Sequence, residues 1–301
     1  MRLALRSIFI AVFLTMAGAA VAGSLEDGKA AYQHQDYATA LQLWRPLADQ
    51  GNAKAQSYLG LMYERGQGMP QSDAEAAKWY HLAADQGLTE AQYNLAEMYH
   101  EGQGVPQNYA EASKWLRLAA DQGLAIAQYN LGFMYAFGQG MPQDYAEAAK
   151  WFRKAADQGI ADAQYNLGIS YAYGNGMPQN YAEAVKWYRL AADQGYASAQ
   201  STLGAMYAYG KGVAQNGAEA AKWWRLAADQ GLAIAQYSLG VMYAFGQGIP
   251  QDYILAHKWF NLAAAQDYQA AIKNRDQIAR NMTPAQIAEA QRLAREWKPK
   301  Q

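Results

Sequence analysis

The sequence contains no cysteine among its 301 residues and only four histidines. The absence of cysteine excludes disulfide bonds, thiolate nucleophiles and cysteine-ligated zinc. The histidines are His34, His81, His100 and His257, and no two of them have the close helical spacing of a zinc site. We therefore expect the protein to bind no metal and to need no cofactor.

Charged residues are also scarce. They make up 17% of the chain, whereas apolar residues make up 51%. The 25 lysines and arginines nearly balance the 26 aspartates and glutamates, which leaves a formal net charge of −1. Such a chain has no basic field to attract nucleic acid, and it has enough apolar side chains to bury a core. We expect a folded protein without a nucleic-acid partner.

Recognisable catalytic motifs are missing too. The sequence has no nucleophile elbow, kinase signature or paired-carboxylate motif. The nearest approach to an acid–base group is His100 between Glu97 and Glu101, and we interpret these three residues as an exposed helix face. The sequence predicts a protein that is not an enzyme and has no catalytic residues.

The N-terminal segment has the pattern of a signal peptide. Arg2 and Arg6 precede an apolar run over residues 8–16, and the small residues Ala-Val-Ala at 20–22 form a cleavage site. The apolar run is shorter than the roughly 20 residues that a membrane-spanning helix needs. We predict export with removal of residues 1–22, a periplasmic or secreted location, and no stable membrane insertion of the mature protein.

What the sequence has in abundance is self-similarity, with a period of 36 residues. The period is marked by Trp79, Trp115, Trp151, Trp187, Trp223 and Trp259. A fixed period between 20 and 50 residues is typical of a solenoid, in which each repeat buries its apolar face against its neighbours.

One repeat, residues 123–158, predicts two helices. Residues 125–137 lack proline and place apolar side chains at helical spacing. Gly138 ends this helix, because glycine takes up the left-handed conformation of a C-terminal cap. Asp144 begins the second helix as its N-cap, and Glu147 three residues later completes a capping box. The sequence therefore predicts an all-α stack of antiparallel helix pairs.

Three motifs recur in every repeat with few exceptions. They are Ala127, Leu131, Gly132 and Tyr135; Gly138, Gly140 and Pro142; and Ala148, Trp151, Ala155 and Ala156. These motifs resemble the Sel-one-like repeat, a relative of the tetratricopeptide repeat. The resemblance implies a right-handed superhelical solenoid whose first helices line a concave groove, and a scaffold or adaptor function. One branch of the family is cysteine-rich and linked to β-lactam binding, but this chain lacks those cysteines.

The period also predicts the boundaries of the parts. We expect a signal peptide over residues 1–22, an N-terminal capping helix pair over 23–50, six repeats over 51–266, and C-terminal capping helices with a tail over 267–301.

Positions that differ between repeats are free for recognition, because those that stay the same hold the fold. On the first helix, the variable positions correspond to Ile126, Asn130, Phe133 and Phe137, which share one face. By the resemblance, this face lines the groove. The candidate binding residues are Arg65, Glu97, Glu101, Tyr129, Phe133, Phe137, Tyr165, Ile169, Tyr173, Tyr209, Tyr237 and Phe245.

Several functions fit these residues. The leading hypothesis is a non-enzymatic scaffold that binds a protein or an extended peptide of the cell envelope in the groove. Stacked tyrosines such as Tyr129 and Tyr165 would equally suit a cell-wall glycan, and a β-lactam or cell-wall hydrolase is the third possibility. Alternatively, the aromatic side chains at the Phe137 position only pack between neighbouring helices. The oligomeric state stays open.

Overall fold

The structure, a computed structural model, describes residues 24–300. All regular secondary structure in that range is helical, so the predicted all-α class is confirmed. The predicted signal peptide over residues 1–22 lies outside the described residues. The chain divides into two compact units, one ending at Gln143 and the other beginning at Asp144.

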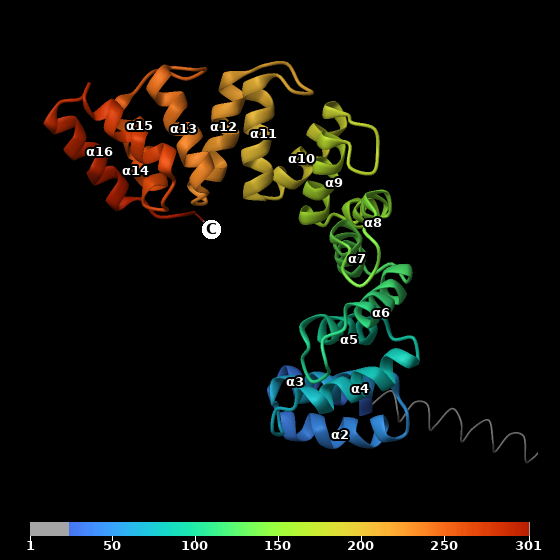
Figure 1. Cartoon of the computed structure of the whole chain (residues 1–301). Coiled ribbons are helices and arrows are strands. Elements are labelled where there is room, and N and C mark those ends of the chain that lie inside the picture. The colour runs from blue at the N-terminus through green and yellow to red at the C-terminus, as the bar shows by residue number, and fades with distance from the viewer. Residues whose placement is uncertain (1–23, 301) are drawn as a thin grey trace, which may run out of the picture. The chain divides into compact units, whose positions relative to one another are not determined.

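The N-terminal unit opens with helical residues 24–33. Successive helices then lie side by side as antiparallel pairs, as Figure 1 shows. They are α2 (Tyr37–Asp49), α3 (Ala53–Arg65), α4 (Asp73–Asp85), α5 (Thr89–Glu101), α6 (Tyr109–Asp121) and α7 (Ala125–Phe137).

The C-terminal unit continues the same alternation of first and second helices (Figure 1). Its helices are α8 (Tyr145–Asp157), α9 (Ala161–Tyr173), α10 (Tyr181–Asp193), α11 (Ala197–Tyr209), α12 (Gly217–Asp229), α13 (Ala233–Phe245), α14 (Tyr253–Ala264), α15 (Gln269–Ala279) and α16 (Pro284–Glu296). Helix α7 has the bounds that the sequence predicted, and α8 follows the predicted N-cap Asp144.

The capping boxes predicted for the second helices form only in part. The Asp144 carboxylate accepts hydrogen bonds from the backbone of Ala146 and Glu147, as expected of an N-cap. The Glu147 side chain does not complete the box. It pairs instead with Lys150, 2.6 Å away, because a lysine three residues on lies on the same helix face. A complete capping box is present at Thr283, the N-cap of α16.

A buried glutamine in each first helix joins neighbouring helices. Gln164 of α9 is only 5% exposed. Its amide nitrogen donates to the carbonyl of Ala156 in α8, at 3.2 Å, and its amide oxygen accepts from Gln194 at the end of α10, at 2.7 Å. Gln92 and Gln200 make the same two bonds. This role was not predicted from the sequence, because a polar glutamine interrupts the apolar pattern of the helix.

Replacing Gln164 by leucine should lower the stability of the protein. The variant removes both hydrogen bonds of the buried Gln164 amide, and each such bond contributes about 0.5–1.5 kcal/mol to stability. The matched control is Gln291→Leu, because Gln291 is exposed on α16. Urea unfolding followed by circular dichroism measures the difference, and equal midpoints for the two variants would contradict the role of the buried amide.

The loop after each first helix contains two glycines with different tasks. Gly102 is the left-handed C-cap of α5, with φ +73°. Gly104 lies against the start of α4, where a Cβ atom would sit 2.1 Å from the Asp73 carbonyl oxygen. Gly140 meets the Tyr109 carbonyl in the same way, at 2.2 Å. The second glycine is therefore a site of close contact between repeats, in addition to the helix termination that the sequence predicted.

Alanine at Gly104 and at Gly87 should have unequal effects. Both glycines have positive φ, which costs about 1–2 kcal/mol for any other residue. Only Gly104 also meets backbone atoms, whereas nothing lies within 4 Å of a Cβ atom at Gly87. Gly104→Ala should therefore lose about 1–3 kcal/mol more than Gly87→Ala, by analogy with overpacked cores. Thermal unfolding compares the stability of the two variants. Equal losses of stability would show that the loop can move to accommodate the added Cβ atom without cost.

Candidate functional site

A cavity of about 270 Å³ lies between the first helices α5 and α7 of the N-terminal unit. Some of its lining residues are candidate binding residues predicted from the sequence, and the others were not predicted. Its lining consists of Glu97, His100, Glu101, Leu116, Tyr129, Asn130, Phe133, Met134 and Gln139. Four of the candidate binding residues, Glu97, Glu101, Tyr129 and Phe133, are thus brought together.

The electrostatics of this α5–α7 cavity centre on Glu97. Asn130 of α7 donates from its amide nitrogen to the Glu97 carboxylate at 3.0 Å, and the same amide lies 3.4 Å from the Tyr93 hydroxyl. Burial raises the pKa of the Glu97 carboxyl, and the charge of Glu101 adds to the increase. The Asn130 hydrogen bond and nearby His100 oppose this shift. Glu97 is therefore a half-buried carboxylate held in place by a neighbouring repeat.

His100 joins the acidic side of the cavity. Its Nδ1 atom lies 2.7 Å from a carboxylate oxygen of Glu101, and its Nε2 atom lies 3.5 Å from the side-chain oxygen of Gln139. The side chain of His100 is 31% exposed. The interpretation of these residues as an exposed helix face holds for Glu101, whose side chain is 57% exposed. It is wrong for Glu97 and His100, which are half-buried because α7 and the loop after it cover them.

The aromatic side of the cavity is accessible. The rings of Phe133 and Phe137 lie 4.4 Å apart between centroids, and Phe137 is 62% exposed. The corresponding residues of the C-terminal unit are exposed to a similar degree, with Tyr209 at 73%. The alternative in which the side chains at the Phe137 position only pack between helices is therefore wrong. The exposed residues at this position are Phe137, Tyr173, Tyr209 and Phe245.

Other candidate residues contact their own neighbours. Arg65, at the end of α3, lies 3.5 Å from the Tyr32 hydroxyl and does not line the α5–α7 cavity. In the C-terminal unit, the Tyr165 ring packs against Tyr196 at 5.3 Å, and Ile169 is partly buried on the same core cluster. These three candidate binding residues therefore also make packing or polar contacts within the fold.

The C-terminal unit repeats the cavity with other side chains. A cavity of about 220 Å³ lies between α11 and α13, with Tyr237 at the position of Tyr129 and Tyr209 at that of Glu101. A third one, of about 140 Å³, lies between α13 and α15 and includes Phe245. No aspartate or glutamate lines either of them. The fold thus supplies the cavity, and the variable residues determine its chemistry.

Residues 24–300 contain no group of three or more histidine, aspartate or glutamate side chains placed to hold a metal ion. Within the same range, no helix has both the length and the apolar character needed to cross a membrane.

Glu97→Gln should stabilise the protein at neutral pH. Because burial raises the pKa of Glu97 in the folded state, the ionised carboxylate destabilises the fold above that pKa, whereas protonation at low pH removes the penalty. Glutamine keeps the acceptor for Asn130 and carries no charge. The gain in urea midpoint should be present at pH 7 and shrink toward pH 4.

The control for this comparison is Glu90→Gln on the same helix. Glu90 is exposed in the first turn of α5, where the helix dipole favours a negative charge, so its substitution should not raise the midpoint. A gain for Glu97→Gln that is the same at pH 4 and pH 7 would contradict the burial of a charged group.

Comparison with known proteins gives the family. The model of the Sel1 repeat matches seven consecutive segments, at residues 21–52, 53–88, 89–124, 125–160, 161–196, 197–232 and 233–268. Among curated proteins, no similar sequence was found.

Two solved structures resemble the chain over most of its length. One is a protective antigen of uropathogenic Escherichia coli, described as displaying an SLR fold, with 34% identity and a TM-score of 0.84 over 92% of this chain. This chain spans 61% of that antigen's length. The other is a Sel1 repeat protein from Oxalobacter formigenes, with 32% identity and a TM-score of 0.69 over 80% of this chain and 96% of that one. The chain therefore belongs to the Sel1 repeat family, whose members generally mediate interactions between proteins.

Proposed function

We propose that this protein is an exported, non-enzymatic scaffold of the cell envelope that binds a protein or an extended peptide through the cavities between its first helices. One observation carries the proposal. The side chains that vary between repeats, such as Phe137, are exposed on the first helices, while the recurring Ala127 and Leu131 are fully buried. Variation is thus concentrated where a partner can reach it.

The α5–α7 cavity suits a segment that carries a basic side chain next to an apolar one. Glu97 and Glu101 supply negative charge, and the first of these is partly shielded from water. The neighbouring rings of Phe133 and Phe137 supply a rigid apolar contact area, which is typical of residues that dominate protein interfaces. The cavities of the C-terminal unit, with Tyr209 and Phe245, suit apolar side chains.

Two of the candidate tyrosines, Tyr165 and Tyr237, are engaged in ring packing, which favours peptide binding over glycan binding at these two positions. A sugar ring stacks on an open aromatic face, but the Tyr165 ring packs against Tyr188 and Tyr196. The Tyr237 ring likewise packs against Phe260 and Tyr268. The exported location rests on the N-terminal sequence pattern alone.

The double variant Phe133→Ala/Phe137→Ala tests the proposal. It removes Phe133 from the lining of the α5–α7 cavity and the exposed Phe137 ring beside it, and it should weaken partner binding at least tenfold, as expected when aromatic anchors are truncated. Crosslinking in the native envelope identifies the partner, and titration with the purified partner gives the affinity. The variant should keep its helical circular dichroism spectrum, because Phe137 is largely exposed.

The matched control is Leu118→Ala, because Leu118 is an exposed apolar residue on the second helix α6. It should bind the partner as the unaltered protein does. Unchanged affinity of the phenylalanine variant, or equal losses in both variants, would overturn the assignment of binding to the first helices. Turnover of a cell-wall fragment or β-lactam that is lost in Glu97→Gln would favour the hydrolase instead.

A further inference from the structure

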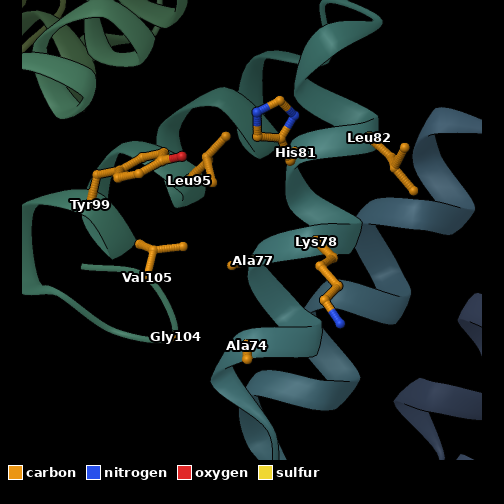
Figure 2. A pocket seen from close by; sticks show the side chains of 9 residues that line it. All are labelled: Ala74, Ala77, Lys78, His81, Leu82, Leu95, Tyr99, Gly104 and Val105. Carbon is orange, nitrogen blue, oxygen red and sulfur yellow. The ribbon is translucent and has the colours of Figure 1, made fainter. Parts of the chain in front are cut away.

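A second cavity of the N-terminal unit, of about 470 Å³, lies between α4, α5 and the loop after α5. Figure 2 shows its walls. They are made by Ala74, Ala77, Lys78, His81, Leu82, Leu95, Tyr99, Gly104 and Val105. It shares none of these residues with the α5–α7 cavity, and it takes no part in the function proposed above.

Other repeats hold an arginine at the position of His81. In the C-terminal unit, Arg153 of α8 donates a hydrogen bond to the Tyr171 hydroxyl of α9. Its guanidinium carbon also lies 5.6 Å from the centre of the Tyr171 ring and 5.5 Å from that of Trp187. The equivalent arginine–tyrosine pairs are Arg45–Tyr63, Arg117–Tyr135, Arg189–Tyr207 and Arg225–Tyr243.

His81 breaks this series. Its Nδ1 atom bonds to Asp85 at 2.9 Å, and its ring meets Trp115 edge-on at 5.4 Å. Tyr99 stands where the other repeats have the tyrosine that accepts from arginine, yet its hydroxyl has no hydrogen-bonding partner among residues 24–300. In Figure 2 this hydroxyl points from α5 toward Leu95 and His81. The shorter imidazole therefore leaves room where a guanidinium lies in other repeats.

We propose that this cavity binds an arginine side chain of a partner polypeptide, which supplies from outside the guanidinium that the chain itself supplies in other repeats. The guanidinium donates to the Tyr99 hydroxyl and lies against the Trp115 ring, as Arg153 does with Tyr171 and Trp187. A planar, delocalised guanidinium can make both contacts at once and is weakly hydrated, whereas a lysine ammonium is a compact, strongly hydrated point charge that is less suited to them.

The charges around the cavity tolerate this ligand. Lys78 lies in the wall, but it pairs with Glu75 at 2.5 Å. Lys150 and Glu147 form the same pair next to Arg153 in the repeat that contains the arginine. The cationic neighbour is thus present in a repeat where the guanidinium is known to fit.

The source of the arginine is a polypeptide rather than the free amino acid. Leu82, at the wall of the cavity, is 47% exposed and offers apolar contact to the residues that flank the arginine. The free amino acid has no such flanking residues, and it adds a carboxylate and an ammonium group that the cavity does not pair.

The acetylated tripeptide amide Ala-Arg-Ala is the probe, titrated into the full-length mature protein and followed by isothermal calorimetry and by the indole N–H signal of Trp115. We expect one site with a dissociation constant on the order of 1 mM, which suits a ligand of this size. The citrulline and lysine versions of the peptide, and free arginine, should bind at least tenfold more weakly.

His81→Arg is the decisive variant, because it restores the residue found in other repeats and should fold at least as stably. It should abolish binding, while Tyr99→Phe should weaken it several-fold. Arg153→His should open a second site and raise the stoichiometry from one to two. Glu97→Gln/Glu101→Gln should leave binding unchanged, which separates this cavity from the acidic α5–α7 cavity.

Binding that survives His81→Arg, or that is lost in Glu97→Gln/Glu101→Gln, would overturn the proposal and assign the arginine to the α5–α7 cavity. Equal affinity for the citrulline peptide would show that the cavity recognises shape without charge. No shift of the Trp115 signal up to 20-fold above the expected constant, about 20 mM peptide, would also overturn it.

Discussion

The stack of helices depends on one buried hydrogen-bonding group, the glutamine of each first helix. Gln164 bonds to a carbonyl at the end of α8 and to a side chain at the end of α10, so one amide holds three successive helices in register. An unpaired amide in the core would cost more than an apolar side chain, and each glutamine therefore tolerates only the arrangement that satisfies it. The register set in this way repeats every 36 residues, and it places equivalent residues in equivalent surroundings.

That regularity makes the differences between repeats informative. The cavity between adjacent first helices occurs in both units, with acids and phenylalanine in the N-terminal unit and with tyrosine in the C-terminal one. Because the backbone is the same, the contrast is due to side chains alone. The replacement of arginine by His81 acts similarly, since it removes a guanidinium from a position whose tyrosine is kept in the following helix. A repeat protein can thus gain a binding site when a long side chain is replaced by a shorter one.

The same reasoning applies to the glycines inside the first helices. Gly168 meets the Tyr188 ring and Gly204 the Trp224 ring, and in each case a Cβ atom would come within 2.8 Å of ring atoms. In α5 the position is Ala96, and the residue twenty places later is Leu116. A glycine in the first helix thus occurs together with a large aromatic ring twenty residues later. Glycine lowers the helix propensity at these positions, but it lets the two helices of a repeat pack closely.

The sequence by itself determined the period, the helical class, the bounds of α7 and the N-cap at Asp144, because these follow from local spacing and from residues a few places apart. It also singled out Phe137 as a variable residue. The tertiary structure alone decided that Glu97 is half-buried, that Gln164 is a structural residue, and that His81 adjoins an open cavity. Each of these depends on contacts between side chains about thirty residues apart or on neighbouring helices, and no local pattern encodes the distance at which two such side chains meet.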